Sequence, residues 1–95
     1  MDDEGNTLLM LAAQDNQIEI CKALIAAGAD VNARKPQGTT ALMRAALNGH
    51  NEICKTLIAA GADINAVNNH ITALVVAQHK GHIDVVKTLR AAGAR

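Results

Sequence analysis

The sequence predicts an all-α repeat solenoid, a stack of three helix-turn-helix units linked by hairpin-like turns. The first observation is a repeat: residues 19–33 read EICKALIAAGADVNA and residues 52–66 read EICKTLIAAGADINA, a period of 33 residues. The second is that the chain has no Phe, Trp or Tyr and much Ala, which suits helices that pack closely. We expect one domain, residues 1–95, with units at about 2–34, 35–67 and 68–95.

The first helix of the middle unit should begin after Thr40, whose hydroxyl can accept a hydrogen bond from a backbone N–H of the first turn. Leu42, Ala45 and Ala46 then follow the i, i+3, i+4 spacing of a buried helical stripe. Gly49 stands where the helix should end, because glycine readily takes the left-handed conformation of a helix C-terminus.

The second helix of this unit should run from about residue 52 to residue 60, with Ile53, Cys54, Leu57 and Ile58 on one face. Gly61 ends it in the same way as Gly49 ends the first helix. Each helix is shorter than the roughly 12 residues at which isolated helices become even marginally stable in water. Stability must therefore come from stacking, and about three units are the minimum.

The third unit departs from the repeat in two ways. Gly49 and Gly81 are 32 residues apart, one fewer than the period, and the lost residue falls within 67–71. This predicts a shortened or bent hairpin tip. Arg90 replaces an apolar residue on the side where a further unit would stack, which is typical of a polar end cap.

The middle unit carries a known pattern: TALMRAA at 40–46, Gly-His at 49–50, Leu-Ile at 57–58 and GADIN at 61–65. These residues resemble the ankyrin repeat, in which Thr-Pro-Leu-His-x-Ala-Ala is followed by Gly-His, Leu-Leu and Gly-Ala-Asp-x-Asn. The first and third units match at fewer positions, and the resemblance covers essentially the whole chain.

The chain also departs from this family pattern. Proline is absent from all three Thr-Pro-Leu-His sites, and the His of that motif is replaced by Met10, Met43 and Val75. In the family this His ties neighbouring repeats together by hydrogen bonds, so apolar packing must replace it here. Asn16-Gln17 stands in place of Gly-His in the first unit.

The resemblance implies a module that binds another protein through a concave surface made of hairpin tips and the exposed side of the first helices. Arg44 is the central candidate, because its guanidinium can form two hydrogen bonds to a carboxylate and Leu11 and Val76 flank it with apolar surface. The predicted contact residues are Asn6, Leu11, Asp15, Arg34, Gln37, Thr39, Arg44, Asn48, His70, Val76, His79 and Lys80.

Charge and hydropathy exclude several other classes of function. The formal net charge is zero with neutral His, so we expect no binding to nucleic acid or to an anionic membrane surface. No apolar run approaches the roughly 18 residues of a membrane span. The acidic beginning Met1-Asp2-Asp3-Glu4 does not have the pattern of a signal peptide.

The two cysteines occupy equivalent positions in successive units. They should lie about 10 Å apart, the spacing of packed layers, which is too far for a disulfide. Unpaired cysteines are typical of reducing compartments, so we expect an intracellular protein, cytoplasmic or nuclear.

No arrangement of residues indicates catalysis, and we expect neither an enzyme nor a cofactor. His79 and His82 have the i, i+3 spacing of a metal pair, but no Cys or carboxylate completes a ligand set, so we expect no metal.

Two alternatives to a natural binding module remain open. The chain could be an engineered or truncated scaffold without a natural partner, or it could self-associate through incompletely capped ends. A monomer is expected.

Overall fold

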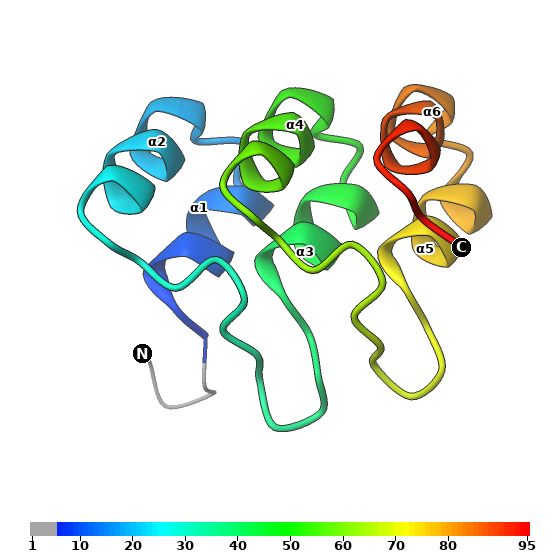
Figure 1. The fold of residues 1–95 in the computed structure, drawn as a ribbon, viewed down its shortest axis with the longest axis horizontal. Helices are drawn as coiled ribbons and strands as arrows, with labels where there is room; N and C mark the ends of the chain where they lie inside the picture. The colour runs from blue at the N-terminus through cyan, green and yellow to red at the C-terminus, as the bar shows by residue number, and fades with distance from the viewer. Residues whose placement is uncertain (1–5) are drawn as a thin grey trace.

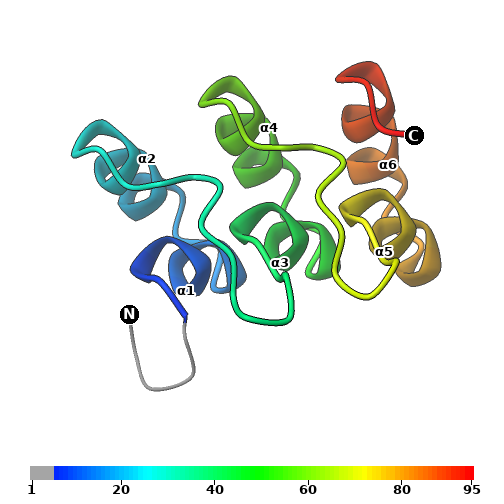
Figure 2. The same cartoon turned by 60° about the horizontal axis from the view of Figure 1, so that its bottom comes forward.

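The computed structural model describes residues 6–95 and arranges them as two layers of helices. Figure 1 shows α1, α3 and α5 in one layer and α2, α4 and α6 in the other. Figure 2 shows the long loops leaving the helices on the side of α1, α3 and α5. We call these layers the inner and the outer layer. The helices are α1 (Leu8–Gln14), α2 (Ile18–Ala26), α3 (Ala41–Leu47), α4 (Asn51–Ala59), α5 (Ala73–Lys80) and α6 (Ile83–Ala91). The predicted all-α stack is confirmed.

A threonine directly precedes each inner helix. The hydroxyl accepts a hydrogen bond from the backbone N–H three residues later, over 3.1 Å at Thr7, 3.2 Å at Thr40 and 3.3 Å at Thr72. These bonds satisfy one of the N–H groups that the first turn leaves without a helical partner. The predicted cap at Thr40 is confirmed, and the same device begins the other two inner helices.

The core lies between the two layers. Leu42, Ala45 and Ala46 of α3 are all at most 1% exposed, as their spacing predicts. Ile53, Cys54 and Leu57 of α4 are fully buried, whereas Ile58 is only partly buried at the edge of the cluster. Burying one large aliphatic side chain contributes roughly 1.5–3 kcal/mol. Contacts between the layers therefore stabilise helices that are too short to be stable alone.

The inner helices pack against one another more closely than the outer helices do. Alanines make this possible, because Ala41 and Ala45 of α3 and Ala73 and Ala77 of α5 are nearly or fully buried. Figure 1 shows the outer helices spread further apart than the inner ones. The stack is therefore held most tightly on the side from which the loops leave.

Asparagines after the outer helices link each unit to the next. Asn32 donates from Nδ2 to the carbonyl oxygen of Gly61 (3.1 Å), and its Oδ1 accepts from the N–H of Asp63 (2.6 Å). Asn65 repeats the pattern one unit later, with the carbonyl oxygen of Gly93 (3.3 Å) and the N–H of Arg95 (3.0 Å). Each side chain thus satisfies a carbonyl and an N–H beyond the end of the following outer helix.

Histidines make a second link in the opposite direction. His50 donates from Nε2 to the carbonyl oxygen of Gln14 (3.0 Å), and His82 donates to that of Leu47 (3.1 Å). Each ring thus contacts the end of the preceding inner helix, whose last carbonyls have no helical partner. Gln17 holds the equivalent position in the first unit.

The two hairpins differ because of the missing residue. In the first hairpin, the N–H of Lys35 donates to the carbonyl of Thr39 (3.0 Å) across a loop in which Gly38 has a φ of 104°. In the second, Asn68 and Ile71 exchange hydrogen bonds of 2.8 and 2.9 Å. The two residues between them, Asn69 and His70, have φ values of 52° and 70°, the left-handed pair of a type I′ turn. The predicted shortening of this tip is confirmed.

We predict that Gly49→Ala destabilises the protein by about 2–3 kcal/mol. Gly49 has a φ of 72°, and an added Cβ would lie 2.8 Å from Nδ1 of His82, so the ring and its bond to Leu47 would have to shift. Urea unfolding followed by circular dichroism measures the change.

Gly81→Ala is the matched control. Its φ is 75°, but an added Cβ would have no neighbour within 4 Å, so only conformational strain of about 1 kcal/mol should remain. Equal losses in the two variants would contradict the role assigned to the His82 ring.

We predict that His70→Gly stabilises the protein by about 0.5–1 kcal/mol. Glycine relieves the left-handed strain of roughly 1–2 kcal/mol at His70, and Asn-Gly is the favoured type I′ pair, although glycine also adds entropy to the unfolded chain. The control is Gln37→Gly in the other hairpin, where φ is not positive and glycine should be neutral or destabilising. Thermal unfolding of both variants checks the prediction; a stabilisation by Gln37→Gly of the same size would contradict the turn argument.

Candidate functional site

The predicted contact residues differ in how accessible they are. Seven of them are exposed: Asp15, Arg34, Gln37, Asn48, His70, His79 and Lys80. Leu11, Thr39, Arg44 and Val76 are partly buried. All of these lie on the inner helices or on the loops beside them, whereas Asn6 is buried.

The predicted accessibility of Asn6 is wrong. Asn6 is only 4% exposed, and its Oδ1 accepts a hydrogen bond of 2.7 Å from Nη2 of Arg44. The two residues are far apart in sequence, so their pairing could not be seen in the repeat pattern. Asn6 is part of the contact between the first and second units.

Arg44 does not present a free guanidinium. Its Nη1 donates to Oε1 of Gln14, and its Nη2 donates to Asn6. The end of the same helix adds a bond from Nδ2 of Asn48 to the carbonyl oxygen of Arg44 (2.9 Å). The guanidinium is therefore held in one orientation by two acceptors of the first unit, with part of its five-donor capacity already used.

Arg34 and Thr39 fasten the two hairpins together. Nη2 of Arg34 donates to the carbonyl oxygen of Val67 (2.7 Å), and Oγ1 of Thr39 accepts from Nδ2 of Asn68 (2.8 Å). Gly38 lies beneath this contact, where a Cβ would be 2.6 Å from the Val67 oxygen and 3.0 Å from Nη2 of Arg34. These bonds fix the loops relative to each other.

Two adjoining hollows between α3 and α5 share Leu47, Ile71 and Val76. One has a volume of about 300 Å³, and the other about 180 Å³. The residues that complete the first are Val75, His79 and Lys80, and those that complete the second are Thr39, Met43, Arg44 and Asn68. We call the two together the inner groove.

The inner groove is apolar at its centre and cationic at its edge. Leu47, Ile71 and Val75 are 40%, 44% and 44% exposed, although side chains of this size are usually buried. The charged residues that line it are Arg44 and Lys80, and no carboxylate lines either hollow. The arrangement can hold an apolar side chain and attract negative charge beside it.

The structure brings together five of the predicted contact residues at this groove: Thr39, Arg44, Val76, His79 and Lys80. The prediction missed Leu47 and Val75. The sequence did contain one sign that Leu47 is exposed: the equivalent residues of the other inner helices, Gln14 and His79, are polar.

Val75 does not pack as its position predicts. Met10 and Met43, its equivalents, are 0% and 6% exposed and belong to the apolar core, which confirms the expected apolar packing there. Within the described residues no helix covers that side of α5, and Val75 is 44% exposed. Its side chain lines the inner groove instead.

A family model described as "Ankyrin repeats (3 copies)" matches residues 9–95. The chain belongs to the ankyrin-repeat family. A comparison with curated proteins finds no match. Ankyrin repeats are generally protein–protein interaction modules, and the family is typically non-catalytic. No helix within residues 6–95 is long and apolar enough to cross a membrane.

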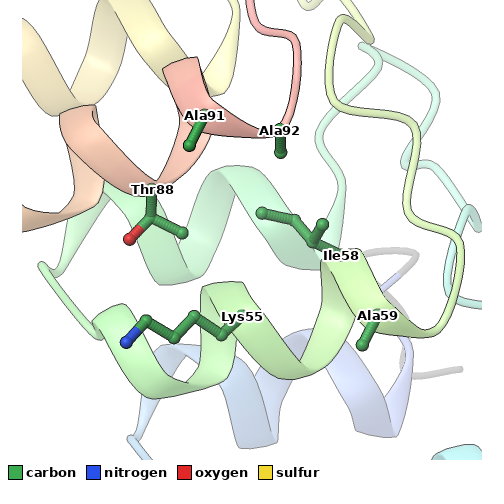
Figure 3. A pocket seen from close by; sticks show the side chains of 6 residues that line it. All are labelled: Lys55, Ile58, Ala59, Thr88, Ala91 and Ala92. Carbon is green, nitrogen blue, oxygen red and sulfur yellow. The ribbon is translucent and has the colours of Figure 1, made fainter.

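A further hollow lies between the outer helices of this ankyrin stack, and Figure 3 shows its lining. It measures about 390 Å³ and is lined by Lys55, Ile58, Ala59, Thr88, Ala91 and Ala92. Its polar groups are already engaged, because Nζ of Lys55 lies 3.6 Å from a carboxylate oxygen of Glu52 and Thr88 donates to Asn51 (2.7 Å). Figure 3 shows Ile58 of α4 opposite Ala91 and Ala92, at the end of α6. It offers few groups for recognition.

The cysteines of the ankyrin stack are free and buried. Burial raises the pKa of both thiols, that of Cys54 to about 12, so the thiolate that would react or bind metal is scarce near neutral pH. Within the part of the chain that the structure describes, no three His, Cys, Asp or Glu side chains are grouped to hold a metal ion. The inner groove is therefore the best candidate site.

Proposed function

We propose that this chain is a protein-interaction module whose three repeats, at about 2–34, 35–67 and 68–95, bind a protein partner through the concave face without catalysis. The inner groove is the observation that carries the proposal. It exposes Leu47, Ile71 and Val75 in adjoining hollows on the side of the inner helices and the hairpins. Exposed apolar side chains grouped in this way are typical of protein-binding sites.

The mechanism is rigid presentation of side chains. The bonds from Arg34 to Val67 and from Asn68 to Thr39 hold the hairpins, so little conformational freedom is lost on binding. A complete interface of standard size would cover about 800 Å² on each partner, which the concave face of a small stack can supply. The buried, unpaired cysteines support an intracellular location, cytoplasmic or nuclear.

Self-association through the ends is the second candidate. Leu8 and Ile20 are 67% and 51% exposed at the first end, although their equivalents in the middle unit, Ala41 and Ile53, are buried. Ile83 at the other end is 66% exposed. Polar residues oppose this assembly, because Gln78 and Arg90 stand at the positions of Ala46 and Ile58. We therefore favour a monomer.

Affinity capture from cell lysate, analysed by mass spectrometry, tests the proposal. The domain is compared with Leu47→Glu/Lys80→Glu, which disrupts the inner groove. The matched control, Ile83→Glu/Lys87→Glu, changes an exposed aliphatic residue and a lysine on α6. We expect a protein that is captured by the domain and by the control but lost with the groove variant.

Three controls complete the experiment. Circular dichroism establishes that the variants are as helical as the parent chain. Sedimentation at several concentrations separates a monomer from an end-to-end assembly, whose mass would rise with concentration. Capture that is equal for all three chains, or no specific capture at all, would contradict binding at the inner groove and favour a scaffold without a natural partner.

A further inference from the structure

The inner groove also indicates the chemistry of its partner. Resting on the proposed function, we infer that it binds a short acidic segment of a protein, which inserts one aliphatic side chain between Leu47, Ile71 and Val76. The carboxylates of this segment lie against Lys80 and against the guanidinium N–H groups of Arg44 that do not bond to Gln14 or Asn6. Four features of the groove lead to this assignment: its size, its charge, the position of that charge and the lack of aromatic residues.

The size of the hollows suits a single side chain. At about 300 and 180 Å³ they lie at or below the lower limit of ligand pockets, which usually measure 300–1,000 Å³. Leu47 and Val76 come from neighbouring helices and Ile71 from the hairpin tip, so an inserted side chain would meet apolar surface on three sides. An anchor of this kind, surrounded by contacts that exclude water, is typical of a binding hot spot.

The charge of the groove comes from Lys80 and Arg44, which can still form ion pairs or hydrogen bonds with a partner. Lys80 is exposed and forms no ion pair within residues 6–95, whereas Lys22 and Lys55 on the outer helices lie near Glu19 and Glu52. Arg44 uses Nη1 and Nη2 for its two acceptors, which leaves further N–H groups of the guanidinium. Because these bonds fix its orientation, a carboxylate can meet it at a small entropic cost.

The sign of the charge changes along the concave face. Equivalent positions at the ends of the three inner helices carry Asp15, Asn48 and Lys80, in that order. The carboxylate of this series directly follows α1, and α3 separates α1 from the helix that carries Lys80. A chain of zero net charge therefore presents a local cationic edge at α5, where complementary charge would guide and orient a partner.

The groove does not have the features of a nucleic-acid site. The chain contains no Phe, Trp or Tyr on which bases could stack, and the two charged residues of the groove are too few for a backbone track. A single aliphatic slot between two cations instead fits a peptide in which Asp or Glu flanks Ile, Leu or Val. The aliphatic side chain of such a peptide would fill the apolar centre of the groove, while its carboxylates would meet the cationic edge.

A displayed library of short random peptides, selected on the immobilised domain, tests this inference. The enriched peptides are then synthesised with a fluorophore, and their binding is measured by fluorescence anisotropy. We expect enrichment of Asp or Glu next to an aliphatic residue. Replacing that aliphatic residue by Ala, or Lys80 by Glu, should weaken binding about tenfold or more. Raising the salt concentration should also weaken it.

Two further variants separate charge from fold. Lys87→Glu makes the same change on α6 and should leave the affinity unchanged. Lys80→Glu should recover binding when the acidic residue of the peptide is replaced by Lys, which a misfolded variant could not do. An unlabelled single-stranded oligonucleotide should not compete; effective competition by it would overturn the assignment to a peptide.

The remaining outcomes distinguish this inference from the proposed function. If the enriched peptides are neutral or basic but still lose affinity for Leu47→Glu, the groove is a protein-binding site and the acidic partner is wrong. If the enriched peptides bind Leu47→Glu and Lys80→Glu as well as they bind the parent chain, both this inference and the proposed binding site are wrong. Failure to enrich any peptide also overturns both.

Discussion

The fold depends on contacts between units, because no helix in the described residues is longer than nine residues. Helices of this length are not stable in water alone, so each must bury its apolar stripe against another unit. The middle unit illustrates the result: Leu42 is only 1% exposed, and Ile53 and Leu57 are fully buried. Alanines in the inner layer allow this stacking, since larger side chains would separate the helices.

The same constraint determines which polar residues are available for binding. Asn32, Asn65, His50 and His82 repeat at fixed positions and satisfy backbone groups of a neighbouring unit. Arg34 and Arg44 are not part of the repeat, yet they also join one unit to the next. Residues that differ between units are therefore not automatically free to contact a partner.

Local features could be predicted from the sequence because each depends on residues close together in the chain. The Thr40 cap, the apolar stripe of α3 and the shortened second hairpin are of this kind. The burial of Asn6 could not be predicted, since it depends on the conformation of an arginine 38 residues away. The candidate site was partly predictable: the family pattern indicated the face, and Val76, His79 and Lys80 lie together there. Its apolar centre depends on which neighbouring side chains remain uncovered.

The position of the groove follows from small changes in the third unit. The loss of one residue produces a two-residue turn, and the pairing of Asn68 with Ile71 then holds an isoleucine at the edge of α5. Val replaces Met at residue 75, and its side chain is left uncovered beside that isoleucine. Leu47, at a position that is polar in both other units, supplies the opposite wall. One deletion and two substitutions on a repeated frame thus create an apolar surface between α3 and α5. The corresponding gap between α1 and α3 does not repeat it, since Gln14 and Asn6 fill that region with partners for Arg44.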